Sequence, residues 1–177
     1  LQDAGAEVIH LGHNRSVNEI ASAALQEGAH AIALSSYQGG HMEFFKYLIN
    51  LLNEKGCGYV KVFGGGGGVI VPEEITELEE YGVAKIFSPE DGKRMGLKGM
   101  IDYMVAAASE VRFPAIDHDY TKVRQKDPVI LGLLVNLAEK AMAGLATDFE
   151  RVISDLRNIS SQVPVVGITG TGGAGKS

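Results

Sequence analysis

Two glycine-rich segments of this chain have the residue types of sites that hold phosphate or a large ligand. The first lies at residues 170–177 and matches the phosphate-loop pattern G-x-x-x-x-G-K-[ST] at every fixed position, directly after an apolar run at 163–168 that is typical of a strand. Backbone N–H groups in such a loop surround phosphates, the lysine neutralises the terminal phosphates and the last hydroxyl binds magnesium. The pattern therefore predicts a nucleotide site formed by Gly170, Gly172, Gly173, Ala174, Gly175, Lys176 and Ser177, with magnesium on Ser177.

The elements that complete a nucleotide-hydrolysing site would follow Ser177, namely the helix that faces the phosphates and the aspartate and switch segments. We therefore do not expect residues 1–177 alone to hydrolyse a nucleotide. The alternative is a glycine-rich turn with an incidental Lys-Ser pair, which the full match and the preceding strand make the less favoured interpretation.

The second glycine-rich segment is the run Gly64, Gly65, Gly66, Gly67 and Gly68, which follows a predicted strand. Open α/β sheets bind ligands at the carboxyl ends of their strands, and glycines allow the backbone to approach a ligand closely. The dinucleotide pattern G-x-G-x-x-G would need a glycine where Val69 stands, so we do not favour a nicotinamide cofactor. A flexible strand-to-helix turn that binds nothing is the remaining alternative for the run.

Hydroxyl groups follow another predicted strand, Ala31–Ser35, at its carboxyl end. Ser35 and Ser36 could cap the next helix or hydrogen-bond a ligand, and from the residues alone capping is the more frequent role. His41 could likewise be a surface residue of that helix, and His10 is expected within a strand. The histidines and Cys57 show no metal-ligand spacing, so no transition-metal site built from protein ligands is predicted.

The hydrophobic pattern favours an α/β fold, since short apolar runs alternate with helical segments. We expect strands at Glu7–Leu11, Ala31–Ser35, Tyr59–Phe63 and Ala84–Phe87, with helices near 16–27, 41–54, 73–81 and 89–111. Capping patterns support helix starts after Ser16, Ser88, Asp127 and Thr147. Residues 1–5 have the pattern of a helix end, so we expect a strand and a helix to precede them in a doubly wound domain.

The pattern changes after residue 112. A polar stretch from Phe113 to Asp127 precedes an apolar helical repeat, and a second helix is expected from Thr147 to about Ser160. We therefore predict three parts: an α/β domain at 1–112, a helical linker at 113–162, and the start of a nucleotide-binding domain at 163–177.

Composition excludes several classes of function. A net charge of −6 argues against a general nucleic-acid binder, and 45% hydrophobic residues argue against a disordered chain. Cys57 is the only cysteine, so an internal disulfide is impossible and a reducing cytoplasm is the expected location. The longest apolar stretch, near residues 128–135, is too short to span a bilayer, so no membrane role is predicted.

Three segments, IALSSYQGGH (32–41), KVFGGGGGVIVPEE (61–74) and VAKIFSPEDG (83–92), closely resemble the cobalamin-binding domain of the methylmalonyl-CoA mutase family. The resemblance covers residues 1–112 and implies a flavodoxin-like domain that lacks its first strand. It places the family's S-x-L serine on Ser35 and its glycine pair on Gly67 and Gly68. It implies that Ser35, Ser36, Tyr37, Gly64 to Gly68 and Ser88 contact the cofactor's nucleotide tail, with Ser88 at the rim of the pocket.

Two departures from the family pattern stand out. Tyr37 replaces the leucine of S-x-L, and the D-x-H-x-x-G motif, whose histidine is the lower axial cobalt ligand in the family, is absent from the chain. That motif belongs before the helix end at residues 1–5, so a truncated domain explains its absence better than divergence does. No catalytic residue is expected in this segment.

The combination of this domain, a helical linker and the segment GITGTGGAGKS (167–177) is similar to the fused isobutyryl-CoA mutases, in which a GTPase chaperone precedes the substrate barrel. The resemblance implies adenosylcobalamin, GTP with magnesium, and an acyl-CoA substrate bound by a barrel outside this chain. It also implies a homodimeric parent enzyme that rearranges isobutyryl-CoA and n-butyryl-CoA. The alternatives are a non-catalytic cobalamin sensor or carrier fused to a regulatory GTPase, and a flavodoxin-like module unrelated to cobalamin.

Overall fold

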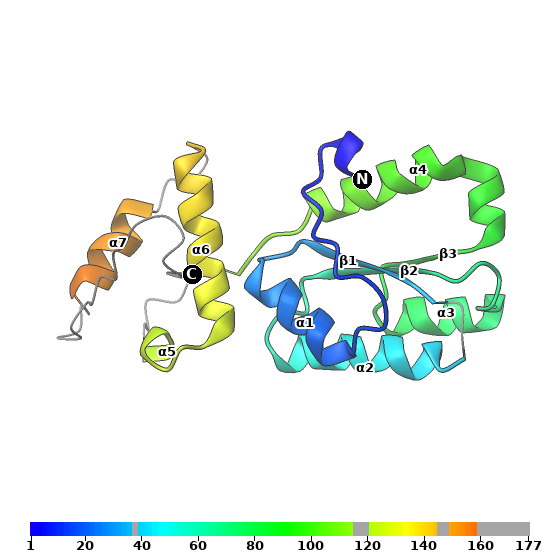
Figure 1. The fold of residues 1–177 in the computed structure, drawn as a ribbon, viewed down its shortest axis with the longest axis horizontal. Coiled ribbons are helices and arrows are strands. Elements are labelled where there is room, and N and C mark those ends of the chain that lie inside the picture. Colours follow the sequence, from blue (N-terminus) through cyan, green and yellow to red (C-terminus); the bar gives the residue numbers. More distant parts are fainter. Residues whose placement is uncertain (37–38, 115–120, 145–148, 159–177) are drawn as a thin grey trace, which may run out of the picture.

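The computed structural model of the chain describes residues 1–36, 39–114, 121–144 and 149–158. The elements, in chain order, are η1 (Gln2–Ala4), α1 (Val17–Gln26), β1 (Ala31–Ser35), α2 (His41–Glu54), β2 (Lys61–Gly65), α3 (Pro72–Tyr81), β3 (Lys85–Phe87), α4 (Pro89–Ser109), α5 (Thr121–Arg124), α6 (Pro128–Met142) and α7 (Phe149–Asn158). Within the described ranges the strands form one parallel sheet in the order β1-β2-β3. Helices α1, α2 and α3 cover one face of this sheet and α4 covers the other (Figure 1).

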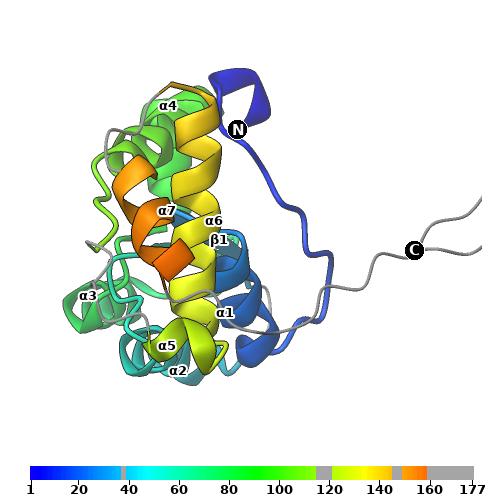
Figure 2. The ribbon, with the colours of Figure 1, turned by 90° about the vertical axis from the view of Figure 1, so that its left-hand side faces the viewer.

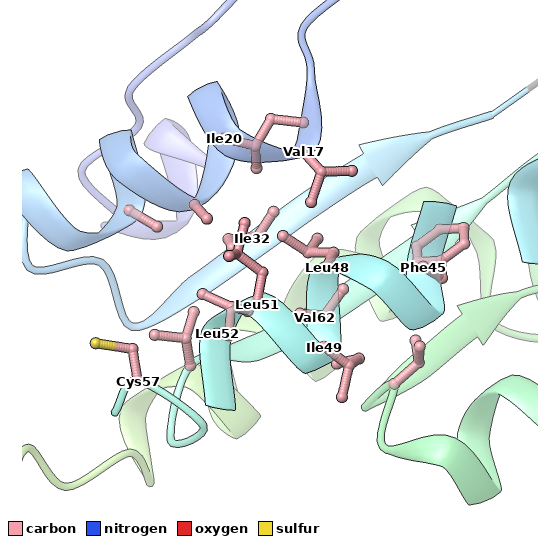
Figure 3. Close-up of a cluster of buried hydrophobic side chains, with 14 of the residues drawn as sticks. Val17, Ile20, Ile32, Phe45, Leu48, Ile49, Leu51, Leu52, Cys57 and Val62 are labelled. Atoms are coloured by element: carbon pink, nitrogen blue, oxygen red, sulfur yellow. The ribbon is translucent and has the colours of Figure 1, made fainter. Parts of the chain in front are cut away.

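The core lies between the sheet and the helices α1 to α3. Phe45, Leu48 and Leu52 of α2 are almost fully buried against Val62 of β2 and Ile86 of β3. Figure 3 shows how the apolar stripe of α2 projects into this layer, with Val17 and Ile20 of α1 closing one side. Burial of these side chains holds the strands in place, and the strands fix where their carboxyl ends lie.

Local signals place the helix starts as the sequence predicts. The Ser16 hydroxyl accepts a hydrogen bond from the Glu19 N–H at 3.3 Å, and the Glu19 carboxylate accepts one from the Ser16 N–H at 2.8 Å, which is the predicted capping box. The Asp127 carboxylate accepts hydrogen bonds from the N–H groups of Val129 and Ile130 and starts α6 at Pro128. Thr147, the other predicted cap, lies outside the described residues.

Two of the predicted strands are corrected by the structure. Glu7–Leu11 forms no strand in the described part of the chain, and His10 is accordingly exposed rather than held in a sheet. A strand needs a partner for its backbone groups, and residues 7–11 pair with none of the strands in the described part of the chain. The strand predicted at Tyr59–Phe63 instead runs from Lys61 to Gly65, so it includes the first two glycines of the run.

Helix α4 is broken at Gly96, whereas the sequence predicts one continuous helix at 89–111. Gly96 has φ 64° and ψ 177°, a conformation that is essentially confined to glycine. The segment before the break begins at the carboxyl end of β3, and the segment after it carries Tyr103, which packs on the sheet against Phe63 and Phe87. The break therefore separates a short helix at the edge of the sheet from the helix that covers its face.

Helix α6 of the predicted linker packs directly on α1. A Cβ on Gly132 would lie 2.3 Å from the carbonyl oxygen of Leu25, and a Cβ on Gly28 would lie 3.2 Å from the Asn136 side chain. Both views show α6 beside the α/β layers with α7 against it (Figures 1 and 2). Helix α6 thus lies against the α/β domain, and the predicted boundaries at residues 112 and 162 remain a prediction.

The ring of Phe113 connects the α/β layers to α6 at the end of the sheet opposite the glycine run. Its centroid lies 4.7 Å from that of His30 and 5.3 Å from that of Tyr59, and the Lys140 ammonium of α6 lies 4.7 Å from the Phe113 ring. Burial, together with the nearby Lys140 charge, lowers the pKa of His30. This cluster is a second point of contact between α6 and the domain.

Among the described residues, no helix combines the length and the apolar character that a membrane span needs.

Replacement of glycine by alanine should have opposite effects on stability at two helical positions, because α6 packs tightly on α1 at Gly132 whereas Gly92 has open space around it. Gly132→Ala should destabilise the chain by about 1–3 kcal/mol, because its methyl group would meet the Leu25 carbonyl. Gly92→Ala in α4 should stabilise it by up to about 1 kcal/mol, because a Cβ there has open space and alanine favours the helix. Urea unfolding of both variants measures the difference. Equal effects in the two variants would contradict the close packing of α6.

The capping box of α4 predicts a loss of stability in acid. Burial alone would raise the pKa of Asp91, but hydrogen bonds from the Ser88 backbone and hydroxyl, with the charges of Lys85 and Arg94, outweigh it and lower the pKa. A carboxyl whose pKa is lower in the folded state stabilises the fold above its unfolded value of 3.8, and this contribution disappears as the pH falls through the folded value.

Asp91→Asn should therefore flatten the decline in unfolding free energy between about pH 5 and pH 2 relative to the unmodified chain. Its matched control is Asp102→Asn, because Asp102 is 54% exposed and pairs with a Lys98 side chain that is 88% exposed. Unfolding midpoints across that pH range provide the measurement. A slope equal to that of the unmodified chain in the Asp91 variant would refute a stabilising role for this carboxylate.

Candidate functional site

The carboxyl ends of the three described strands lie in one row. Ser35 of β1 is in register with Gly65 of β2, which is in register with Phe87 of β3. The hydrogen bond from the Ser36 N–H to the Gly65 carbonyl, at 2.8 Å, extends the pairing one residue beyond β1. The sequence-predicted residues Ser35, Gly65 and Ser88 are thereby brought together at the sheet edge where open α/β folds bind ligands.

The glycines of the run have different structural roles. Gly64 points to the core, where a Cβ would lie 2.5 Å from both the Phe45 ring and the Ile86 side chain. A Cβ on Gly66 would lie 2.4 Å from the Ser36 carbonyl oxygen, so the loops after β1 and β2 meet backbone to backbone there. Packing therefore explains why glycine occupies both positions.

Gly67 and Gly68 form the turn itself. Their φ angles are 57° and 92°, and the Val69 N–H donates a hydrogen bond to the Gly66 carbonyl at 2.9 Å, which is the pattern of a type I′ turn. A Cβ on Gly68 would lie 3.4 Å from the ring of Pro89 at the start of α4. The turn after β2 thus contacts the loop after β3, and three strand-to-helix loops converge at this edge.

The sheet face toward α4 carries small residues at its β1 end. Phe63 and Phe87 contact Tyr103 of α4 on this face, and Ala33 and Ser35 share it because they are in register with Phe63 and Gly65. Ala33 and Ser35 are exposed, so the sheet presents a flat surface of small side chains beside an aromatic wall. We call the residues Ala33, Ser35 and Gly65 the open shelf.

The two hydroxyl groups of the β1 loop do not occupy the predicted capping position. The N-cap residue of α2 is Gly40, four residues after Ser36, so the capping interpretation of Ser35 and Ser36 is wrong. Ser35 is exposed at the end of the open shelf. Ser88, by contrast, uses its hydroxyl to cap α4 through Asp91, at 3.0–3.1 Å. Of the predicted site hydroxyls, that of Ser35 is therefore the one placed on the open shelf.

The structure rules out the alternative in which His41 is a surface residue of α2. His41 is only 8% exposed, and its Nε2 lies 2.9 Å from the Glu74 carboxylate of α3. The Glu74 carboxylate accepts a hydrogen bond from the Val71 N–H, and this contact is the largest cause of its lowered pKa. The hydrogen bond from His41 lowers the pKa of Glu74 further. The two residues are 33 positions apart, and no local sequence pattern links them.

Several predicted site residues lie outside the described part of the chain. These are Tyr37 and the phosphate-loop residues Gly170, Gly172, Gly173, Ala174, Gly175, Lys176 and Ser177, together with the strand at 163–168 that precedes them. Among the described residues, no group of three or more His, Cys, Asp or Glu side chains is arranged to hold a metal ion. The arrangement at the sheet edge suits binding of a large ligand against backbone and small side chains.

Comparison with known proteins gives this edge a family context. Residues 1–97 match the family model of the B12 binding domain. The chain is 51% identical over its whole length to the fused isobutyryl-CoA mutase of Geobacillus kaustophilus and 53% identical to that of Cupriavidus metallidurans. About half of the chain is also 31% identical to the 2-hydroxyisobutanoyl-CoA mutase small subunit of Aquincola tertiaricarbonis, covering 62% of that protein.

The chain spans 17% and 16% of the length of the two fused mutases. The family match argues against the flavodoxin-like module unrelated to cobalamin. It covers α1 to α3, all three described strands and the start of α4, including the open shelf and the glycine turn. This chain therefore belongs to the B12-binding domain family.

Proposed function

We propose that this chain binds the nucleotide tail of adenosylcobalamin at the carboxyl edge of its sheet, as part of an acyl-CoA mutase. The observation that carries the proposal is the open shelf: Ala33, Ser35 and Gly65 leave the α4 face of the sheet accessible where three loops converge. The sequence similarity to fused isobutyryl-CoA mutases over the full chain supports the choice of cofactor.

The residues at the edge fit such a cofactor on chemical grounds. The flat, apolar base of the nucleotide tail needs a broad surface with few side chains, and the shelf beside the Phe63–Phe87–Tyr103 wall offers one. The exposed Ser35 hydroxyl can hydrogen-bond a polar atom at the end of the tail. The turn at Gly67 and Gly68 keeps the space above the edge free of Cβ atoms.

When bound, adenosylcobalamin supplies a radical through homolysis of its cobalt–carbon bond. The residues of this chain would orient and enclose the tail. The axial histidine of the family's D-x-H-x-x-G motif is absent from residues 1–177, so the cobalt ligand would have to come from elsewhere in the protein. We assign the acyl-CoA substrate, isobutyryl-CoA or n-butyryl-CoA, to a barrel outside this chain.

The proposal extends to the carboxyl-terminal segment. Residues 170–177 match the phosphate-loop pattern in full, and we propose that they begin a GTPase that acts as a chaperone for cofactor loading. A homodimeric parent enzyme in the cytoplasm belongs to the same proposal. The relatives that match the whole chain are named fused isobutyryl-CoA mutases, which supports a mutase joined to a further part.

Filling the shelf should weaken cobalamin binding without unfolding the chain. A Cβ on Gly65 would lie 3.6 Å from the Phe87 carbonyl, an ordinary contact, so Gly65→Val should fold and project its methyl groups over the shelf. We expect at least a tenfold loss of cobalamin affinity, or about 1.4 kcal/mol, for the protein expressed from its complete gene. Spectroscopic titration with adenosylcobalamin measures it.

The matched control is Gly64→Ala, one residue earlier and on the opposite face. Its methyl group would crowd Phe45 and Ile86, so this variant should lose about 1–3 kcal/mol of stability and keep its cobalamin affinity when folded. The open-shelf proposal fails if the Gly65 variant binds cobalamin as tightly as the unmodified protein does.

The two proposed ligand sites should respond separately to substitution. Lys176→Ala removes the charge that would neutralise the terminal phosphates, so GTP hydrolysis by the complete protein should fall at least a hundredfold (~2.7 kcal/mol) while the affinity for cobalamin stays the same. Steady-state phosphate release and cobalamin titration measure the two effects. Unchanged hydrolysis in the variant would sink the assignment of residues 170–177.

A further inference from the structure

A single carboxylate oxygen joins two of the loops at the carboxyl edge of the sheet. Glu74 Oε2 lies 2.9 Å from His41 Nε2 and accepts a hydrogen bond from the Val71 N–H at 3.1 Å. His41 is the first residue of α2, at the end of the loop after β1. Val71 lies three residues after Gly68, the last residue of the glycine turn after β2. The oxygen thus lies between the ends of both loops.

The ionisation of the carboxylate determines which group donates the hydrogen bond in this pair. An ionised carboxylate is only an acceptor, so the 2.9 Å contact requires that His41 Nε2 carries the proton. His41 is 8% exposed, and a buried imidazole that loses its partner pays the cost of an unmade hydrogen bond. Removal of the Glu74 carboxylate therefore takes a hydrogen-bond acceptor away from a buried imidazole.

Two further contacts join α2 and α3, and they can be compared with the His41–Glu74 pair. Lys46 pairs with Glu77, and the Tyr81 hydroxyl donates to the Asn50 side chain at 3.0 Å. The side chain of Glu77 is 58% exposed, whereas that of His41 is 8% exposed. These outer contacts join the bodies of the two helices, and the His41–Glu74 pair alone among the three is attached to the loops at the sheet edge.

We propose that His41 and Glu74 are positioning residues for the cobalamin site, which fix the start of α2 and the segment after the glycine turn relative to each other before the ligand arrives. This inference rests on the proposed function of the same edge. A ligand that lies across two loops binds more tightly when the loops are already ordered, because less ordering cost is met on binding. In this proposal the His41–Glu74 pair orders these segments without contacting the ligand itself.

The test is a double-mutant cycle on cobalamin affinity in the protein expressed from its complete gene. His41→Ala and Glu74→Ala should each weaken binding about tenfold, and the loss in the double variant should be clearly smaller than the sum of the two, because the contact between the two side chains is lost in all three. Glu74→Gln should bind more tightly than Glu74→Ala, since its amide oxygen can still accept from both the Val71 N–H and the His41 Nε2–H.

Controls separate positioning from general stability. Lys46→Ala and Glu77→Ala remove the outer contact between the same helices, and Gly132→Ala destabilises the fold at α6; all three should keep the affinity of the unmodified protein. Affinity losses in these controls that match those of the His41 and Glu74 variants would overturn the inference, as would additive losses in the cycle. If the unmodified protein binds no cobalamin, the proposed function fails; if it binds and the His41 and Glu74 variants bind equally well, only the positioning role fails.

Discussion

The backbone contact between the ends of β1 and β2 is the constraint on which this edge of the molecule depends. The Ser36 N–H donates to the Gly65 carbonyl, and the Ser36 carbonyl oxygen lies 2.4 Å from the position that a Cβ on Gly66 would take. Two loops that approach this closely leave no room for side chains between them. The close approach requires glycine at residue 66, brings Ser35 level with Gly65, and leaves the α4 face of the sheet flat at the point where a ligand would lie.

The buried layer beneath the edge supports this arrangement from the other face. Phe45 fills the space under Gly64, so α2 lies close to β2 at its carboxyl end. The first residue of α2 then meets the first turn of α3, which allows the contact between His41 and Glu74. Core packing and the geometry of the loops are therefore linked through one helix, α2.

The sequence predicts the periodic parts of the fold well. Helices α1, α2 and α3 have apolar stripes and clear starts, and their observed bounds lie within about a residue of the prediction. The strand Glu7–Leu11 was wrong because an apolar run reports burial potential but not the presence of a neighbour for its backbone groups. The break at Gly96 was missed because a glycine in a helical pattern is compatible with both a continuous and a broken helix.

The sequence predicts only part of the candidate site, because local patterns reveal unusual residue types but not contacts between distant residues. The glycine run and Ser35 stand out because their residue types are unusual after a strand, and the structure brings them together at one edge. His41 and Glu74 were missed because their meaning comes from a contact across 33 residues of sequence, which local patterns do not encode. Glu74 satisfies a local capping pattern through Val71, and the same oxygen also meets the distant histidine. A residue that fits a local capping pattern can therefore also make a long-range contact. Only the arrangement of α2 and α3 shows that Glu74 does more than cap its own helix.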